Sequence, residues 1–298
     1  MKITRVESLV YGVEDLDAGI RYFEDWGLQA VERGANGAAF RMPSGQSIVV
    51  RSATDTALPA ANENGSTLRE AIWGVDDAAS LEQIGAELGR DRDVKRDNEG
   101  GLHARDDAGF AIGFRVAAPT ATAAPASASR MNRPFDPERR ARPSRLGHIV
   151  YNCAKKDIES VLAFYMERLK FRLTDRALDT GAFMRCAGSN DHHNLFFAIR
   201  ADRRSFNHAA FEVRDIDEIV LGGKHMKSRG WRPNTPVGRH ILGSNIFWYF
   251  DNPCGGRTEY FADMDLMDDD WKPRIWEKHP GYAMWMLGKA EIPEITHV

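Results

Sequence analysis

The chain repeats its own pattern on either side of a short connector, and this duplication limits the folds that it can adopt. The segment 4–12 reads TRVESLVYG and the segment 144–152 reads SRLGHIVYN, and in each case an apolar strand pattern leads into a helical pattern. The segments 68–76 and 206–214 form a second such pair. A strand followed by a helix therefore recurs four times, which predicts four βαβββ modules, two on each side of the connector.

The connector contains few large apolar residues. Residues 117–129 read AAPTATAAPASAS, and this composition predicts an exposed linker. We therefore divide the chain into a first domain at 1–117, a linker at 118–143 and a second domain at 144–298. The second domain ends in a tail, from about residue 264 onward, that is rich in aromatic side chains.

A β-rich module of this kind cannot bury both faces of its sheet alone. When two modules pair, their sheets curl around a shared cavity. We therefore expect an α+β fold in which the four modules form two domains, each an open, curved β-barrel. The chain has 298 residues, of which 43% are hydrophobic, and this is enough for two ordinary domains with packed cores.

The charge and the cysteine content limit the binding partners and the cellular compartment that we expect. The formal net charge is −3, which gives no electrostatic basis for binding nucleic acid. No apolar run approaches the roughly 18 residues that are needed to cross a bilayer, so no membrane partner is expected. The first residues form a strand pattern and not the apolar core of a signal peptide. Three cysteines without close spacing fit a reducing cytoplasm.

Two histidines and a glutamate lie on predicted strands of the second domain. His148 and His208 occupy equivalent positions in the third and fourth modules, so their side chains should point to one face at the same depth. Glu259 lies in an apolar stretch, where an unpaired carboxylate would be costly. Two imidazoles and one carboxylate form the ligand set of a non-haem Fe(II) site with open coordination positions.

The first domain lacks this ligand set. Its matching positions are Ser8, Glu70 and a residue near Ile112. These residues cannot build the same site, so we expect only the second domain to be catalytic. The first domain is then expected to support packing.

Other polar residues gather near the same strands. The segment 189–197 brings His192 and His193 to the start of an apolar strand, and its alternation favours His193 as the inward-facing residue. Further on, His240 precedes a strand and Tyr249 lies inside it. Taken singly, the histidines also fit a surface pair, and the tyrosine fits a packed aromatic with a satisfied hydroxyl.

The segment from His240 to Glu259 resembles the signature of the type I extradiol ring-cleavage dioxygenases of the vicinal oxygen chelate superfamily. That signature has a histidine two residues after a small residue, an aliphatic–Tyr pair, an Asn/Asp-Pro-x-Gly turn and a glutamate. Here it reads Gly238-x-His240, Trp248-Tyr249, Asn252-Pro-Cys-Gly255 and Glu259. Trp248 departs from the pattern, which affects packing behind Tyr249 and touches no ligand. The strands around His148 and His208 also resemble the family, and the resemblance covers essentially the whole chain.

The resemblance implies an enzyme of aromatic hydrocarbon catabolism. Such an enzyme inserts both atoms of O2 into a catecholic substrate next to the diol and gives a muconic semialdehyde-type product. The resemblance also implies a mononuclear Fe(II), or Mn(II) in its place, held by His148, His208 and Glu259. The partners are then the catechol and O2, and we expect a homo-oligomer between a dimer and an octamer.

By the same analogy, three further residues have catalytic roles. His193 faces the oxygen, steadies developing negative charge and gives a proton. His240 and Tyr249 hydrogen-bond the substrate oxygens and orient the ring, so they also bind the substrate. From strand position, the wall of the substrate pocket is expected to include Phe183, Phe197, Ile241 and Phe247.

Two other readings of the chain stay open. One is a glyoxalase-like metal isomerase or epimerase, although Ser8 and the poorly matching first domain argue against a site shared by four strands. The other is a metal-free small-molecule binding protein on the same fold, which would not need His148, His208 and Glu259 together. The tail has three candidate placements, namely over the cavity mouth, between subunits, or against its own domain.

Overall fold

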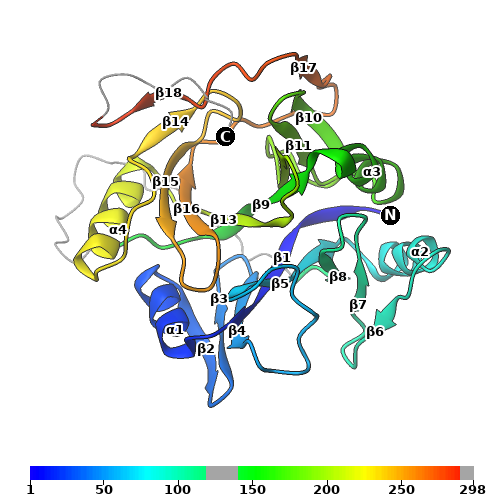
Figure 1. Ribbon diagram of the computed structural model, residues 1–298, viewed down its shortest axis with the longest axis horizontal. Coiled ribbons are helices and arrows are strands. Elements are labelled where there is room, and N and C mark those ends of the chain that lie inside the picture. The colour runs from blue at the N-terminus through cyan, green and yellow to red at the C-terminus, as the bar shows by residue number, and fades with distance from the viewer. Residues whose placement is uncertain (119–139, 289–298) are drawn as a thin grey trace.

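The computed structural model describes residues 1–118 and 140–288. Most of the expected linker (119–139) and the end of the tail (289–298) lie outside the described residues. The described parts form two mixed β-sheets that lie side by side, with the first half of the chain in one and the second half in the other (Figure 1). No helix within the described ranges is long and apolar enough to cross a membrane.

The first sheet contains two βαβββ modules in tandem. The first module consists of β1 (Ile3–Val13), α1 (Leu16–Asp25), β2 (Gln29–Gly34), β3 (Gly37–Arg41) and β4 (Ser47–Ser52). The second consists of β5 (Thr67–Val75), α2 (Ala78–Leu88), β6 (Lys95–Arg96), β7 (Leu102–Arg105) and β8 (Ala111–Val116). The strand order is β2-β3-β4-β1-β5-β8-β7-β6, and β1 and β5 pair antiparallel where the modules meet.

The second sheet repeats this arrangement and adds two strands from the tail. Its first module consists of β9 (Arg145–Ala154), η1 (Lys155–Asp157), α3 (Ile158–Ala163), η2 (Phe164–Arg168), β10 (Arg172–Ala177), β11 (Gly181–Arg185) and β12 (Leu195–Arg200). Its second module consists of β13 (Ser205–Glu212), α4 (Ile216–Ser228), β14 (Gly238–His240), β15 (Ile246–Asp251) and β16 (Arg257–Ala262). The tail adds β17 (Arg274–Trp276) and β18 (Ala283–Met286).

The order of the second sheet is β17-β10-β11-β12-β9-β13-β16-β15-β14-β18, so the tail strands occupy both of its edges. The four predicted βαβββ modules are confirmed, and they form two mixed sheets. Within the described residues, the first and last strands of each order do not pair with each other, so each sheet is open. The division into domains at 1–117 and 144–298 stays a prediction.

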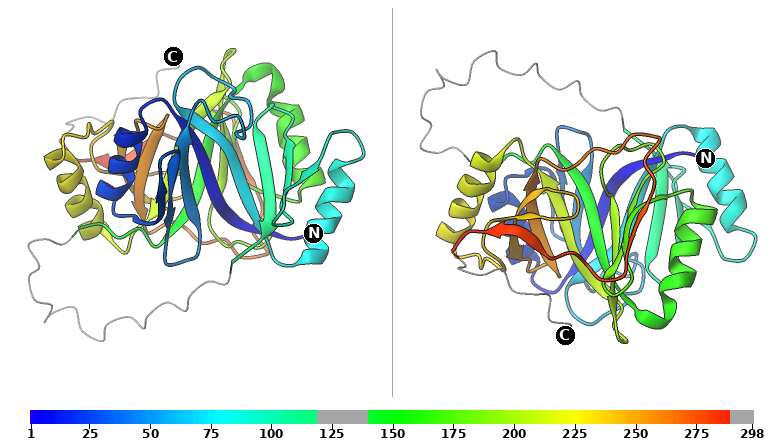
Figure 2. Two further views of the ribbon diagram at one scale, coloured as in Figure 1. Left: turned by 90° about the horizontal axis from the view of Figure 1, so that it is seen from below. Right: turned by 90° about the horizontal axis from the view of Figure 1, so that it is seen from above.

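The helices α1, α2 and α4 each begin at an aspartate that caps them. Asp15 accepts a hydrogen bond from the Ala18 amide (2.9 Å), Asp77 from the Ser80 amide (2.7 Å) and Asp215 from the Glu218 amide (3.0 Å). Each carboxylate satisfies an amide that has no partner inside its helix. The helices α1 and α4 lie together at one end of the molecule and α2 and α3 at the other, with the strands between them (Figure 2).

The first domain packs against the back of β16, the strand that carries Glu259. Trp26, which follows α1, stacks on Tyr260 with ring centroids 3.5 Å apart and an interplanar angle of 4°. The Tyr260 hydroxyl donates to the Trp26 carbonyl (2.7 Å), and the hydroxyls of Tyr22 and Thr258 also bond to each other. Because neighbouring residues of a strand face opposite sides, this packing on Thr258 and Tyr260 directs Glu259 away from the first domain.

Candidate metal centre

Three side chains from neighbouring strands converge at one point. His148 lies on β9, His208 on β13 and Glu259 on β16, and Ala210 pairs with both His148 and Glu259, which puts the three strands in register. The Nε2 atoms of His148 and His208 lie 3.1 and 3.3 Å from Oε2 of Glu259. Within the described part of the chain, these three residues form the group whose metal-binding atoms all lie within 4.8 Å of one another.

Two asparagines orient these side chains. Nδ1–H of His208 donates to Oδ1 of Asn207 (2.8 Å), which leaves the lone pair of the imidazole on Nε2. Asn245 donates from Nδ2 to Oε1 of Glu259 (2.9 Å), which turns Oε2 toward the two histidines. Nε2 of His208 is buried and makes no hydrogen bond within the described residues. A buried, lone-pair-bearing nitrogen beside a carboxylate fits a metal ion.

The electrostatics favour the protonation states that metal ligands need. Burial lowers the pKa of His208 to about 4, so its imidazole is neutral at neutral pH. Burial alone would raise the pKa of Glu259, but the two imidazoles beside it bring the pKa well below its ordinary value. The site therefore offers one negative charge on Glu259 and a neutral nitrogen donor on His208.

The first domain has no such arrangement at the matching place. Ser8 pairs with Ile72 as His148 pairs with Ala210, so Ser8 holds the position of His148, as predicted. Glu70 matches His208 but is bonded to His103 (2.8 Å), and Ile72 pairs with Gly113, which therefore matches Glu259. A serine, a glutamate with its own histidine partner and a glycine cannot hold an ion as the second domain can.

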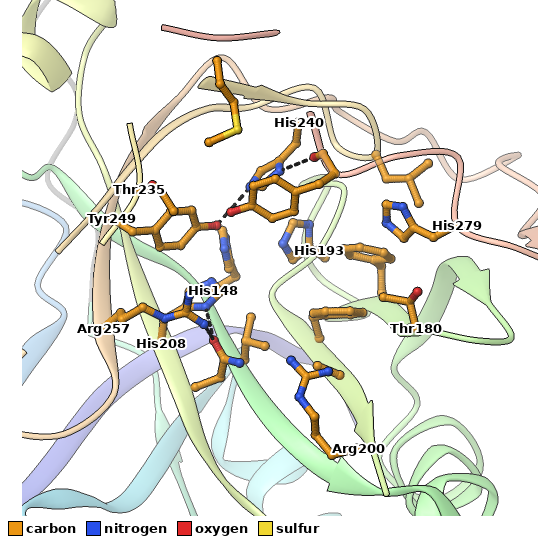
Figure 3. A pocket seen from close by; sticks show the side chains of 18 residues that line it. His148, Thr180, His193, Arg200, His208, Thr235, His240, Tyr249, Arg257 and His279 are labelled. Carbon is orange, nitrogen blue, oxygen red and sulfur yellow. Dashed lines mark hydrogen bonds between the residues drawn. The ribbon is translucent and has the colours of Figure 1, made fainter. Parts of the chain in front are cut away.

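A cavity of about 420 Å³ lies in front of His148 and His208. Figure 3 shows His148, His193, His208, His240 and Tyr249 arranged around this one space. The structure thus brings together the two histidines predicted to be ligands and the three residues predicted to be catalytic. This volume lies in the range of roughly 300–1,000 Å³ that is common for small-molecule sites.

His193 lies next to the candidate ligands. Its ring centroid is 4.1 Å from that of His148, and Nδ1 of His193 lies 3.0 Å from Nδ1 of His192. Burial, followed by the nearby His148 and His192, lowers the pKa of His193 well below its ordinary value. His193 is therefore neutral at neutral pH.

His240 and Tyr249 form a second pair at the cavity. Nδ1–H of His240 donates to the carbonyl of Tyr282 (2.9 Å), so its Nε2 can accept, and the Tyr249 hydroxyl donates to it (3.0 Å). Burial, with a contribution from Glu259, raises the pKa of Tyr249 well above its ordinary value. Tyr249 therefore acts as a neutral hydroxyl.

The predicted pocket wall is only partly present. Phe183 lines the cavity, whereas the other three aromatic and aliphatic candidates do not: Phe197, Ile241 and Phe247. Cδ1 of Ile241 lies against Gly281 of the tail, and the next residue, Leu242, faces the cavity instead. The ring of Phe247 stacks behind His240 at 4.0 Å, so it supports the site from outside the cavity.

The tail completes the cavity and also packs on its own domain. His279, Tyr282 and Met286 line the cavity, while β17 pairs with β10 and β18 pairs with β14. Tail residues can be assigned to a pocket only when their partner strands are known, and the sequence carried no signal for that pairing. The same holds for Asn245, whose partner Glu259 lies on another strand.

Known proteins resemble this chain over part of its sequence. Residues 145–260 match the family model of the Glyoxalase/Bleomycin resistance protein/Dioxygenase superfamily. Metapyrocatechase 2 of Cupriavidus necator is 36% identical over 128 residues, which is 43% of this chain and 39% of that relative. The match therefore spans well under half of the relative's length.

Solved structures show the same fold over nearly the whole chain. The 2,3-dioxygenase LapB from Pseudomonas sp. KL28 superposes with a TM-score of 0.75 at 18% identity and covers 93% of this chain and 98% of its own. The Mn(II)-bound glyoxalase from Novosphingobium aromaticivorans has a TM-score of 0.73 at 22% identity, over 94% of this chain and 89% of its own. At these identities the likeness establishes the fold.

Proposed function

We propose that this vicinal oxygen chelate protein is an iron-dependent extradiol dioxygenase, which cleaves a catechol next to its diol and inserts both atoms of O2. The observation that carries the proposal is that the His148, His208 and Glu259 group adjoins a cavity lined by His193, His240 and Tyr249. The names of the relative Metapyrocatechase 2 and of the structural neighbour LapB, a 2,3-dioxygenase, support the same reaction class.

The residues suit a divalent ion with sites left open for substrate. His148, His208 and Glu259 would hold Fe(II), or Mn(II) in its place, with a single negative charge from the carboxylate. The loaded site would keep a net charge of about +1, which favours a singly deprotonated catechol. When bound, the iron supplies the redox-active centre at which a catechol and O2 can react.

His240 and Tyr249 would recognise the substrate oxygens. Tyr249 is a hydroxyl donor, and the carbonyl of Tyr282 fixes His240 so that Nε2 is its acceptor. A donor and an acceptor side by side can bind one hydroxyl and one oxyanion of a catecholate and so orient its ring. Both side chains are held by the protein before the substrate arrives, so little reorganisation is needed.

His193 would move the proton. It is neutral and lines the cavity, so it can take the proton that the catechol loses and return it when the ring opens. The cavity leaves room around these groups for a substituted ring, with Phe183 and Leu242 among its apolar walls. We expect the substrate to be a catechol that carries a large substituent.

The compartment and the oligomeric state of the enzyme are also part of the proposal. Its three cysteines are all free and buried, which supports a reducing compartment such as the cytoplasm. The apolar side chains of Ile275 and Met284 are exposed on the edge strands β17 and β18, which supports a homo-oligomer. Light scattering of the purified protein measures its mass in solution and tests this part.

Oxygen consumption tests the proposed reaction. Protein purified without air and loaded with Fe(II) should consume O2 in proportion to added catechol and form a yellow ring-opened product. A panel of catechols with substituents of increasing size would identify the class of substrate. Iron-loaded protein that consumes no O2 with any member of the panel would contradict the proposal.

A glyoxalase-like isomerase is the second candidate, because one structural neighbour is a Mn(II)-bound glyoxalase. This alternative predicts turnover without O2 and tight binding of Mn(II), Ni(II) or Zn(II). It gives no role to His193, which lies beside the candidate ligands. The oxygen electrode therefore separates the two candidates in one measurement.

A further inference from the structure

A chain of hydrogen bonds runs from the tail strand β17 to the candidate metal centre. Oδ2 of Asp175 lies 2.8 Å from Nε2 of His192, and Nδ1 of His192 lies 3.0 Å from Nδ1 of His193. Asp175 and His192 are completely buried, and His193 is 5% exposed where it lines the cavity. Neither Asp175 nor His192 touches the cavity, so the proposed reaction does not by itself explain them.

Asp175 is held as an ionised acceptor. Arg274 donates from Nε to Oδ1 (2.8 Å) and from Nη2 to Oδ2 (2.7 Å), and Trp276 donates from Nε1 to Oδ1 (2.7 Å). Burial alone would raise the pKa of Asp175, but the hydrogen bonds from His192, Arg274 and Trp276 bring it below its ordinary value. The ion pair with Arg274 also balances the carboxylate charge.

The hydrogen positions follow from this anchor. An ionised carboxylate can only accept, so Nε2–H of His192 donates to Asp175. An imidazole carries one ring proton, so once Nε2–H of His192 donates to Asp175, its Nδ1 keeps a lone pair. Nδ1–H of His193 must then donate to that lone pair. The lone pair of His193 is left on Nε2.

We propose that Asp175 and His192 are positioning residues that hold His193 in the tautomer with an unprotonated Nε2. This inference deepens the proposed function, since His193 then starts each cycle as the proton acceptor for the catechol. In the transfer, the O–H bond of the catechol breaks, an N–H bond forms at Nε2 of His193, and no electrons change hands. The imidazolium is stabilised because its Nδ1–H still donates toward His192 and Asp175.

The tail thereby takes part in the chemistry without touching the substrate. Arg274 pairs with Asp175 in the parallel register of β17 and β10, and this places the guanidinium over the carboxylate. Loss of β17 would remove the hydrogen bonds of Arg274 and Trp276 to Asp175. Asp175 would then no longer hold His193 in one tautomer. A tail that only covered the cavity would not affect a ring nitrogen of His193.

Nitrogen NMR of the full-length, metal-free protein with 15N-labelled histidine tests the inference directly, and His193→Gln assigns the signals. In the wild type, Nδ1 of His193 should be protonated and Nε2 should not. In Asp175→Asn the side-chain amide can donate to Nε2 of His192, and His192 then carries its proton on Nδ1. Nδ1–H of His192 donates to Nδ1 of His193, so His193 should carry its proton on Nε2. A wild-type His193 that already carries its proton on Nε2 would overturn the proposal.

Kinetics of the iron-loaded enzyme give the second readout. Asp175→Asn and His192→Gln should lower kcat by roughly 10- to 100-fold, within the range of general acid–base assistance, while KM and iron content change little. The matched control is Asp97→Asn, which removes a carboxylate bonded to His103 in the first domain (3.0 Å) and should leave kcat unchanged. If Asp175→Asn and His192→Gln both keep full kcat, Asp175 and His192 have no role in the reaction. If the wild type consumes no O2, the proposed reaction fails, and the NMR result still decides the tautomer.

Discussion

At the scale of single residues, we expect Asn245 to determine how well Glu259 binds a metal. Asn245 holds Oε1 of Glu259, and both side chains are completely buried. Asn245→Leu keeps a similar volume but removes the donor, so the carboxylate can turn. We expect affinity for Fe(II) to fall by roughly 10- to 100-fold, the range seen when a partner of a metal ligand is lost. Competition with a chelator of known affinity measures the change.

The matched control for this prediction is Asn62→Leu. Asn62 is exposed and accepts a hydrogen bond from Arg105 (3.2 Å) in the first domain. Its replacement should leave iron affinity unaltered. Equal affinities for the wild type and Asn245→Leu would show that Glu259 does not depend on Asn245.

The sequence predicts the group of candidate ligands that the structure brings together, but not the residues that hydrogen-bond to them. His148 and His208 occupy equivalent places in repeated modules, so a repeat is enough to pair them. Asn245 and Asp175 act on residues of other strands, and the sequence has no marker for those contacts. Strand alternation favours His193 as the inward-facing residue, and His193 lines the cavity, but alternation does not predict that the buried His192 bonds to it.

At the scale of elements, β16 links the metal centre to the first domain. One face of the strand presents Glu259 and the other packs on Trp26 through Tyr260. Trp26→Ala should lower the free energy of unfolding by about 3–5 kcal/mol, as is usual for a large buried aromatic. It should also lower iron occupancy, because β16 loses its backing. Urea unfolding and metal analysis of the same sample check both effects.

Leu266→Ala is the control at this scale. Leu266 is 71% exposed, so its truncation should change the free energy of unfolding by less than about 0.5 kcal/mol. A Trp26→Ala variant with wild-type stability and full iron would show that the first domain does not support β16.

Regular elements could be predicted more closely than irregular ones. A helix is expected after the strand at 206–214, and α4 follows it as one regular helix at Ile216–Ser228. The helix after β9 is harder, since it begins as a 3-10 turn, continues as α3 and ends as the π-type segment η2. β17 and β18 are three and four residues long and exist because neighbouring strands pair with them. Such short strands leave no periodic signal.

At the scale of the whole molecule, a buried carboxylate joins the two halves. Asp106 of the first half accepts the hydroxyl hydrogen of Tyr165 in the second half (2.9 Å). Burial raises the pKa of Asp106 to about 6, against an ordinary value of 3.8. Between these values the folded state holds a proton that the unfolded state has released. The free energy of unfolding should therefore fall as the pH rises from about 4 to 6 and then level off.

Asp106→Asn tests this linkage. Asparagine can still accept from the amides of Ala108 and Phe110 through its oxygen, and it does not ionise. The variant should be more stable than the wild type at pH 7 by up to about 3 kcal/mol, at about 1.4 kcal/mol per pKa unit. Urea unfolding at pH 4, 5, 6 and 7 measures it, with the exposed Asp107→Asn as control. A variant that is less stable at pH 7 would contradict the assigned ionisation.

The plan of the whole molecule could be predicted because it is a repeat. Four similar modules predict the two sheets, and the first half lacks the matching histidines and glutamate, so the candidate site is predicted in the second half. The cavity itself could be predicted less well, since Ile241 faces Gly281 while His279 and Tyr282 arrive from the tail. Those contacts depend on where the chain returns after β16, which no local pattern encodes.

Iron content is the most direct test of the central claim, that His148, His208 and Glu259 hold one ion. Elemental analysis of protein purified without air and loaded with Fe(II) should give about one iron per chain in the wild type and in Ser8→Ala, the matching position of the first domain. His148→Ala, His208→Ala and Glu259→Ala should each give almost none. Full iron in any of these three variants would contradict the account.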